Sequence, residues 1–415
     1  MNIKYYSLLD VLRFLAAVFV MLFHYYSGSL QNINIPPDSI LHNLQILLYT
    51  LVNHGYLGVE LFFIISGFVI YNSLKNKKDT NGNTIDKLDI KAYAWSRFIR
   101  LYPLFWILCT ITYIMTIFMA SSHLPFYKYL LNLFIINNGQ TANMIDGSYW
   151  TLTIEILFYI YIGLFAYVAG RKNIIYFFAL WLGYSFISYT FGFSELLISK
   201  LLLVRYAPYF VYGGTLAILI QYILNFNYFV KEKRQHLFNL TKSYFTLSKK
   251  ASLFNFLEIK NKIRVLEGFF LPICLMIASI YMTKYISNHL IAINEARVMT
   301  NKFGIFNGLN QTLIYYIFAI ATLFTFLSLY IENKTLIKYL QILGLATYPL
   351  YLMHQRMGSM IIELYTDFGV IDIYSVSITI VIVLIAIYVG VLDKDMRKYI
   401  TRMYLMLPWG SSAKR

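Results

Sequence analysis

The sequence predicts an all-α polytopic membrane protein with about ten transmembrane helices and both termini in the cytoplasm. Apolar segments long enough to cross a bilayer recur along the whole chain. Of the 415 residues, 59% are hydrophobic and 13% are charged, and the mean hydropathy is +0.60. A soluble domain would carry about 25% charged residues. The length would allow two or three soluble domains, but this composition favours a single membrane domain.

Ten segments are predicted to span the membrane, because about 20 apolar residues are needed for a helical span. They are 8–26, 56–74, 101–120, 149–169, 174–191, 196–223, 266–286, 309–330, 339–364 and 371–391. Two shorter apolar runs, 41–52 and 130–136, are expected to lie at the interface or to re-enter the membrane.

The basic residues alternate between the predicted loops. The loop 75–100 holds seven Lys and Arg residues and the loop 225–264 holds nine, whereas 29–40 holds none and 121–148 holds only Lys128. Under the positive-inside rule this pattern places both termini in the cytoplasm. We therefore interpret the net charge of +16 as a topology signal and as contact with anionic membrane lipid, and expect no nucleic-acid partner.

The domain organisation is expected to be simple. Residues 1–392 form one transmembrane domain with cytoplasmic basic loops at 75–100 and 225–264, and 393–415 form a short basic cytoplasmic tail. The first apolar segment is expected to be retained, because no small-residue cleavage site follows it. We interpret the loop 225–264 as a solvated or lipid-facing surface. The alternative interpretation is that it admits an anionic cosubstrate.

Arg13 and His24 are the most informative residues of the first span. Eleven residues make about three helical turns, so the two side chains share one face and lie roughly 16 Å apart along the axis. Asp10 shares that face and is expected to pair with Arg13. An interfacial histidine and a snorkelling arginine would be the plain interpretation. The shared face instead favours a polar path through the membrane.

Other ionisable residues occur inside predicted spans. Glu60 and Glu155 lie in the outer halves of the second and fourth spans, Arg205 in the sixth and His354 in the ninth. Structural buried pairs are one explanation and a functional site is the other. Either Glu60 or Glu155 could be the partner of His24.

Arg97 and Arg100 stand one helical turn apart just before the third span, in WSRFIRLYPLFW. Orientation in the membrane explains basic residues there, but two guanidinium groups at this spacing also suit bidentate phosphate binding. No Cys and His cluster with metal-ligand spacing occurs, so no metal is expected. The predicted layout places arginines at the cytoplasmic entrance and a histidine with carboxylates in the outer half.

The chain resembles the membrane-bound acyltransferase family 3 in several motifs. These are LDVLRFLAAVFVMLFH with its R-x10-H pair, GVELFFIISGF, RFIRLYPLFW, SYWTLTIEILFY, RYAPYFVYGG and YPLYLMH, in the family's order from residue 9 to 354. The family has Asp where this chain has Glu60. Many relatives carry an extracytoplasmic SGNH domain, and this chain resembles the stand-alone type.

The resemblance implies an O-acyltransferase that moves an acyl group, by family default acetyl, from cytoplasmic acyl-CoA to a hydroxyl of a surface or lipid-linked glycan. It implies catalytic roles for His24 and Arg13 and a coenzyme A role for Arg97 and Arg100. Glu60 and Glu155 fall on motif positions with less defined roles, and Arg205 and His354 are acceptor-side or structural residues. The composition is compatible with a bacterial inner-membrane protein.

Two mechanisms are compatible with the sequence. His24 acts either as a general base on the acceptor hydroxyl or as a nucleophile that forms an acyl-histidine. The rival function is a glycan exporter or flippase without acyl transfer, since intramembrane charges also serve transporters. The absence of a repeated half with paired broken helices counts against it. A purely structural scaffold would leave the ordered charges without a purpose. The acyl group, the acceptor sugar and the oligomeric state are not determined by the sequence.

Overall fold

The chain folds into two compact units in a computed structural model. The structure describes residues 5–31, 48, 51–74, 77–78, 84–85, 88–119, 124–135, 144–240, 266–298, 311–367 and 371–406. The first unit comprises Met1–Phe62, Leu88–Tyr167 and Ala319–Arg415, and the second comprises Phe63–Lys87 and Val168–Phe318.

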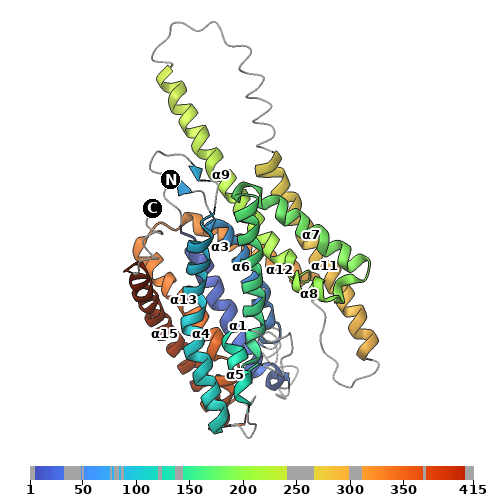
Figure 1. Cartoon of the computed structure of the whole chain (residues 1–415), viewed down its shortest axis with the longest axis vertical. Coiled ribbons are helices and arrows are strands. Elements are labelled where there is room, and N and C mark those ends of the chain that lie inside the picture. The colour runs from blue at the N-terminus through green and yellow to red at the C-terminus, as the bar shows by residue number, and fades with distance from the viewer. Residues whose placement is uncertain are drawn as a thin grey trace, which may run out of the picture. The chain divides into compact units, whose positions relative to one another are not determined.

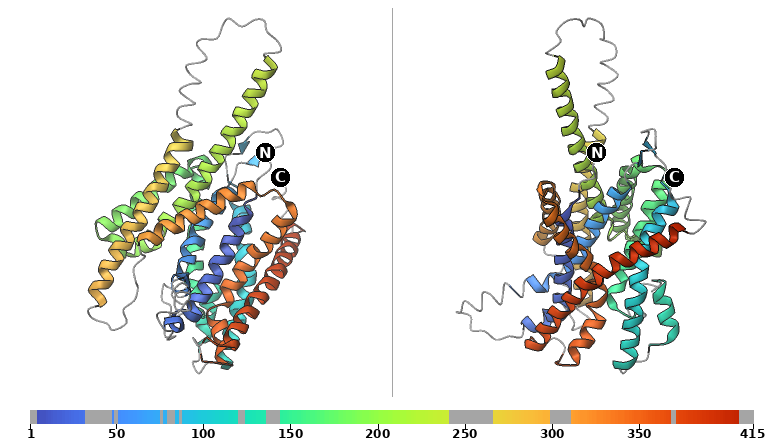
Figure 2. Two further views of the ribbon diagram at one scale, coloured as in Figure 1. Left: turned by 180° about the vertical axis from the view of Figure 1, so that it is seen from behind. Right: turned by 90° about the vertical axis from the view of Figure 1, so that its left-hand side faces the viewer.

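The first unit is a bundle of long helices (Figure 1). Its elements are α1 (Ser7–Gln31), η1 (Gly55–Leu57), α4 (Ile90–Met119), α5 (Phe126–Leu133), η3 (Gly147–Tyr149), α6 (Trp150–Val168), η7 (Ser328–Tyr330), α13 (Lys334–Met353), α14 (Arg356–Glu363) and α15 (Ile373–Met406). Helix α13 packs on both α1 and α15, and α4 contacts α13, α14 and α15. The two views of Figure 2 show α1, α13 and α15 side by side.

The second unit contains a separate group of helices. Its elements are β1 (Lys77–Lys78), β2 (Thr84–Ile85), η4 (Arg171–Asn173), α7 (Ile174–Thr190), η5 (Phe193–Glu195), α8 (Leu197–Leu201), α9 (Ala207–Leu240), η6 (Leu266–Phe270) and α11 (Leu271–Val298). Helices α7, α9 and α11 pack on one another, and β1 pairs with β2 antiparallel. Helices α3 (Gly58–Ser73) and α12 (Gln311–Leu327) contribute residues to both units.

The helical, multi-pass fold class is confirmed. Within the described residues, eight helices are long and apolar enough to cross a membrane. The two remaining predicted spans, 174–191 and 339–364, correspond to α7, which has 17 residues, and to α13 with α14. The short run 130–136 overlaps α5, which has eight residues, and most of 41–52 lies outside the described residues. The orientation of the termini stays a prediction.

The predicted sixth span, 196–223, is wrong at its start because the chain is not continuously helical there. Helix α8 ends at Leu201, residues 202–206 form turns, and Leu203 has a φ of 53°. Pro208 explains the interruption, since a proline inside a helix clashes with the carbonyl four residues earlier. Arg205 therefore lies in an exposed turn and not inside a span.

Side chains of α7 satisfy the backbone of this turn. Trp181 Nε1 donates to the Leu202 carbonyl at 2.6 Å, and Ser185 Oγ donates to the Val204 carbonyl at 2.6 Å. Irregular backbone within an apolar segment is stable only when its polar groups find such partners. The interruption is thus fixed by its neighbours.

The predicted ninth span is also interrupted. Helix α13 ends at Met353, His354 is its C-cap, and α14 begins at Arg356. Other boundaries extend beyond the predictions: α4 begins at Ile90, α9 continues to Leu240 into the predicted loop, and α15 continues to Met406 into the predicted tail. The rest of the loop, 241–264, lies outside the described residues.

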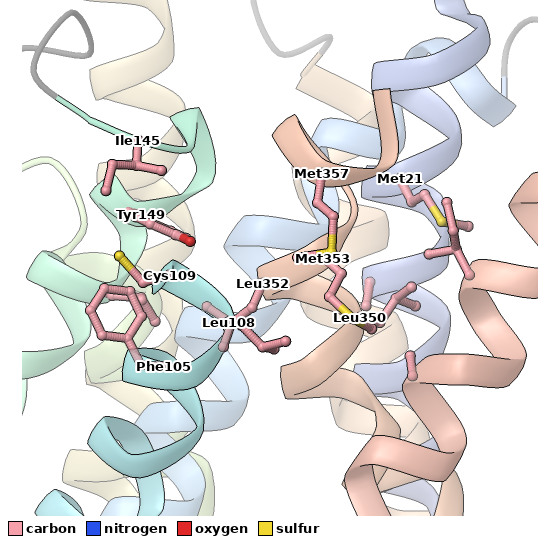
Figure 3. Packing of buried hydrophobic residues seen from close by; sticks show 14 of the residues in the cluster. Met21, Phe105, Leu108, Cys109, Ile145, Tyr149, Leu350, Leu352, Met353 and Met357 are labelled. Atoms are coloured by element: carbon pink, nitrogen blue, oxygen red, sulfur yellow. The ribbon is translucent and has the colours of Figure 1, made fainter. Parts of the chain in front are cut away.

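An apolar cluster fills the first unit (Figure 3). Tyr149 is completely buried, and its ring centroid lies 5.0 Å from that of Phe105 on α4. Figure 3 shows Tyr149 beside Cys109 and Phe105, with Leu350 and Met353 of α13 across the cluster. This packing holds the start of α6 in a fixed place relative to α4.

Two glycines allow α3 and α9 to approach within the second unit. A Cβ on Gly213 would collide with the Ile64 backbone carbonyl, and one on Gly67 would collide with the Phe210 carbonyl. Small residues at helix contacts permit this close backbone approach inside membranes. The contact involves backbone atoms, so no side-chain rotation can relieve a larger residue.

Gly213→Ala is therefore expected to lower the apparent stability by roughly 1–3 kcal/mol, the usual cost of overpacking. Gly183→Ala on α7 is the matched control, because nothing lies within 4 Å of its added Cβ. The control should be neutral or slightly stabilising, since Ala is the better helix former. Thermal unfolding of both variants in detergent measures the difference. Equal midpoints for the two variants would contradict the close approach.

Candidate active site

Helix α1 carries both ends of the candidate site. Arg13 and His24 lie in the same continuous helix, Ser7–Gln31, as predicted. Arg13 has electrostatic contacts with Arg100 of α4 and Glu155 of α6, while His24 faces His354 at the end of α13. The two side chains therefore meet different neighbouring helices at two levels of α1, roughly 16 Å apart.

His24 and His354 form a histidine pair. Their ring centroids lie 5.3 Å apart with an angle of 43° between the planes. His354 is 1% exposed, and its Nδ1 lies 2.8 Å from the Tyr351 carbonyl oxygen. Because a carbonyl only accepts, Nδ1 carries the proton and Nε2 presents a lone pair. Among the described residues, His354 Nε2 has no hydrogen-bond partner.

The break between α13 and α14 places His354 beside α1. The Tyr25 hydroxyl donates a hydrogen bond to the His354 carbonyl oxygen. Gly358 on α14 leaves the space that this hydroxyl occupies, since a Cβ there would collide with it. The interrupted helix is therefore anchored to the same turn of α1 that carries His24.

Asp146 is a site residue that the sequence analysis missed. It is completely buried, and Oδ1 accepts hydrogen bonds from Ser148 N at 2.8 Å and Ser148 Oγ at 2.6 Å. Its Oδ2 accepts from the Arg356 backbone N–H at 2.8 Å. The Asp146 carboxylate also interacts electrostatically with His24. It thus connects the start of α6, the start of α14 and the histidine pair.

The setting of Asp146 is unusual for a carboxyl group. It directly precedes the spanning segment Gly147–Val168. Burial raises the pKa of the Asp146 carboxyl, while the hydrogen bonds from Ser148 and Arg356 and the nearby His24 act against that rise. One sequence signal could have found it: Asp146 is the only acidic residue between 121 and 148.

Tyr351 adds a hydroxyl network to the histidine pair. Thr151 Oγ1 donates to the Tyr351 hydroxyl at 2.9 Å, and that hydroxyl lies 3.3 Å from the Ser148 carbonyl. The Tyr351 ring centroid lies 5.2 Å from that of His354. Glu60 has electrostatic contacts with Tyr56 and Tyr351. Glu60 therefore joins this end of the site through Tyr351.

An arginine cluster occupies the other level of the first unit. Arg13 and Arg100 both interact electrostatically with Glu155 and with Asp10. The Asp10 carboxylate accepts a hydrogen bond from the Tyr5 hydroxyl. The opposite charges of Asp10 and Arg13 thus interact, in line with their spacing of three residues on one helix.

Aromatic side chains extend the arginine cluster. The Tyr159 hydroxyl donates to the Glu155 carboxylate, and the Tyr93 hydroxyl donates to the Tyr159 carbonyl at 3.0 Å. The Arg97 guanidinium lies 5.1 Å from the centroid of the Tyr93 ring and 5.5 Å from that of Tyr159. Stacking of this kind holds a guanidinium in place over the aromatic rings.

The structure differs from the predicted layout at two residues. Glu155 was expected beside His24 in the outer half, yet it interacts electrostatically with Arg13 and Arg100 as well as with Tyr351. The sequence gives the number of residues from Trp150 to Glu155, but this number does not determine which neighbouring helix the Glu155 side chain meets. The predicted and observed neighbours of Glu155 differ for this reason. Arg205 lies in the second unit, exposed, with its guanidinium 5.6 Å from the Tyr206 ring.

The arrangement offers two kinds of chemistry. Three guanidinium groups can bind an anion such as a phosphate. An imidazole pair beside a buried carboxylate can take up and release a proton. Among the described residues, no three His, Cys, Asp or Glu side chains are grouped to hold a metal ion.

Glu155→Gln is expected to lower stability, because Arg13 and Arg100 then lose a negative partner. We expect a loss of roughly 2 kcal/mol, less than the roughly 3–5 kcal/mol of a fully buried pair, because Glu155 is half-buried. The double variant with Arg13→Gln should recover part of the loss. Glu195→Gln, whose exposed pair with Lys200 is 3.0 Å long, should change stability by less than about 1 kcal/mol. Additive losses in the double variant would contradict the coupling.

Comparisons with known proteins identify the family of the chain. The sequence profile of the acyltransferase domain matches residues 6–392. The chain is 28% identical over 124 residues to "Putative acetyltransferase ORF330" of Acidianus two-tailed virus, a match that covers 30% of this chain and 34% of that protein. No solved structure matches significantly. The near-complete match shows that the chain belongs to the acyltransferase 3 family, and its apolar helices are those of a multi-pass membrane protein.

Proposed function

We propose that the protein transfers an acyl group, most simply acetyl, from cytoplasmic acyl-CoA to a hydroxyl of a surface or lipid-linked glycan. The observation that carries the proposal is that one helix, α1, joins the arginine cluster to the histidine pair within one compact unit. An anion-binding end and a proton-transfer end are the two parts that this reaction needs. The acetyltransferase name of the viral relative supports acetyl as the group.

The arginine cluster is the proposed donor site. Arg97 and Arg100 are half-buried one turn apart on α4, and Arg13 faces Arg100 from α1. Guanidinium groups match phosphate oxygens in bidentate geometry. The basic loops support a cytoplasmic position for this end, where acyl-CoA is available, in the inner membrane of a bacterium. The neutral pantetheine arm then covers the roughly 16 Å to His24.

The histidine pair is the proposed reaction centre. His24 takes the proton of the acceptor hydroxyl as its oxygen attacks the thioester carbonyl carbon. The carbon–sulfur bond breaks, and the proton on the imidazolium passes to the departing thiolate. The products are the acyl ester and free CoA. Histidine suits this exchange because its ordinary pKa lies near neutral pH.

An acyl-histidine is the alternative route. In that route His24 attacks the thioester first, releases CoA, and then gives the acyl group to the hydroxyl. Purified protein incubated with radiolabelled acetyl-CoA and no glycan distinguishes the two. Direct transfer predicts no label on the protein, whereas the covalent route predicts label that disappears when the glycan is added.

His24→Ala is expected to abolish both CoA release and acylation of the glycan, with a loss of at least about 100-fold, because the proton acceptor is gone. The matched control is His289→Ala, a half-buried histidine whose ring packs 5.4 Å from that of Tyr189 in the second unit. The assay follows free CoA and labelled glycan with purified protein. Persistent transfer by His24→Ala would reject the base, and glycan translocation without CoA release would favour an exporter.

Arg97→Ala with Arg100→Ala is expected to weaken acyl-CoA binding by at least about tenfold while leaving glycan affinity unchanged, because charge-assisted contacts to phosphate are worth roughly 1.5–3 kcal/mol each. Arg402→Ala, an exposed arginine at the end of α15, is the control. Binding isotherms for acetyl-CoA and for the glycan measure the split. A larger effect on the glycan would place the donor elsewhere.

A further inference from the structure

Asp146 differs from Glu155 and Asp10 in the charged groups that act on it. Glu155 and Asp10 interact with the permanent cations Arg13 and Arg100. Asp146 is completely buried, and among the described residues no Lys or Arg side chain forms an ion pair with it. The ionisable side chain of opposite charge that acts on it is the titratable His24.

The hydrogen bonds of Asp146 indicate an anion. Two donors from Ser148 point at one oxygen and the Arg356 N–H points at the other, so both oxygens accept. A carboxylate is the form that only accepts. Three donors lower the cost of burying the charge but leave it without a fixed counter-charge. A buried anion of this kind is suited to a cation that forms only during the reaction.

We infer that Asp146 is a positioning residue that stabilises the imidazolium formed when the histidine pair takes up the proton of the acceptor hydroxyl. The inference rests on the proposed role of His24. Neither Glu60 nor Glu155 needs to serve this purpose. The Arg356 hydrogen bond also ties Asp146 to the chain two residues after His354, so the same carboxylate fixes the position of the second imidazole.

Several titratable groups surround the histidine pair and could act on a positive charge formed there. From α1 they are His24 itself and the Tyr25 hydroxyl; from α13 they are His354 and Tyr351; from the start of α6 it is Asp146. Glu60 and Glu155 act on Tyr351. Of these groups, Asp146 is the carboxylate whose charge acts on His24.

The test is the pH dependence of acetyl transfer by the purified full-length protein. In Asp146→Asn we expect kcat to fall by on the order of 100-fold with an unchanged KM for acetyl-CoA. The acidic limb of the pH–rate profile should move to lower pH, because the protonated imidazole has lost its counter-charge. Asp146→Ser keeps a capping oxygen for the Ser148 N–H and should show the same shift.

The variant Ser148→Ala distinguishes the effect of the Asp146 charge from the effect of its hydrogen bonding. It removes the 2.6 Å hydrogen bond to Asp146 but keeps the carboxylate, so its acidic limb should stay in place. The exposed Glu195→Gln is the control for loss of a distant negative charge. A lowered plateau with an unmoved limb in both Asp146 variants would overturn the inference, as would a limb that moves in Glu60→Gln instead. Full activity of His24→Ala would reject the proposed base, a separate result.

Discussion

The cost of placing charges inside a helical bundle is the constraint on which the rest of the structure depends. An ionised side chain in apolar surroundings needs a partner, or it costs several kcal/mol. The first unit meets this need in two different ways. At one level, Arg13 and Arg100 face Glu155 and Asp10, so permanent charges balance one another. At the other level, Asp146 faces an imidazole. The first level can hold an anion, and the second can change its charge.

The backbone obeys the same rule at the two helix interruptions. In the second unit, side chains of α7 satisfy the carbonyl groups of the turn 202–206, and the result is structural. In the first unit, the Tyr25 hydroxyl and the Asp146 carboxylate satisfy the break at His354. There the groups that complete the backbone hydrogen bonding also surround the histidine pair. The interruption of α13 therefore positions the proposed reaction centre as well as ending a helix.

Periodicity explains which parts of the site were predictable from sequence. Arg13 and His24 share a long helix, so 3.6 residues per turn were enough to place both on one face. Glu155 could not be placed, because the level of a residue on α6 does not tell which neighbouring helix it meets. Asp146 lies in irregular backbone before η3, where no periodicity applies. Arg205 was misplaced because the apolar run hid the break before Pro208.

The stretch of α1 between the two levels gives the proposed reaction its geometry. Its buried face consists of Ala16, Ala17, Val20 and Met21, and each is at most 2% exposed. These side chains offer no polar partner to a charge, and little of their surface is open to water. Hydrolysis competes with transfer wherever water reaches a thioester, so a dry centre favours the acceptor hydroxyl. A donor whose charged end binds at the arginines must therefore present a neutral arm at the histidines. Acyl-CoA is a donor of this kind, because its phosphates are charged and its pantetheine arm, which carries the thioester, is neutral.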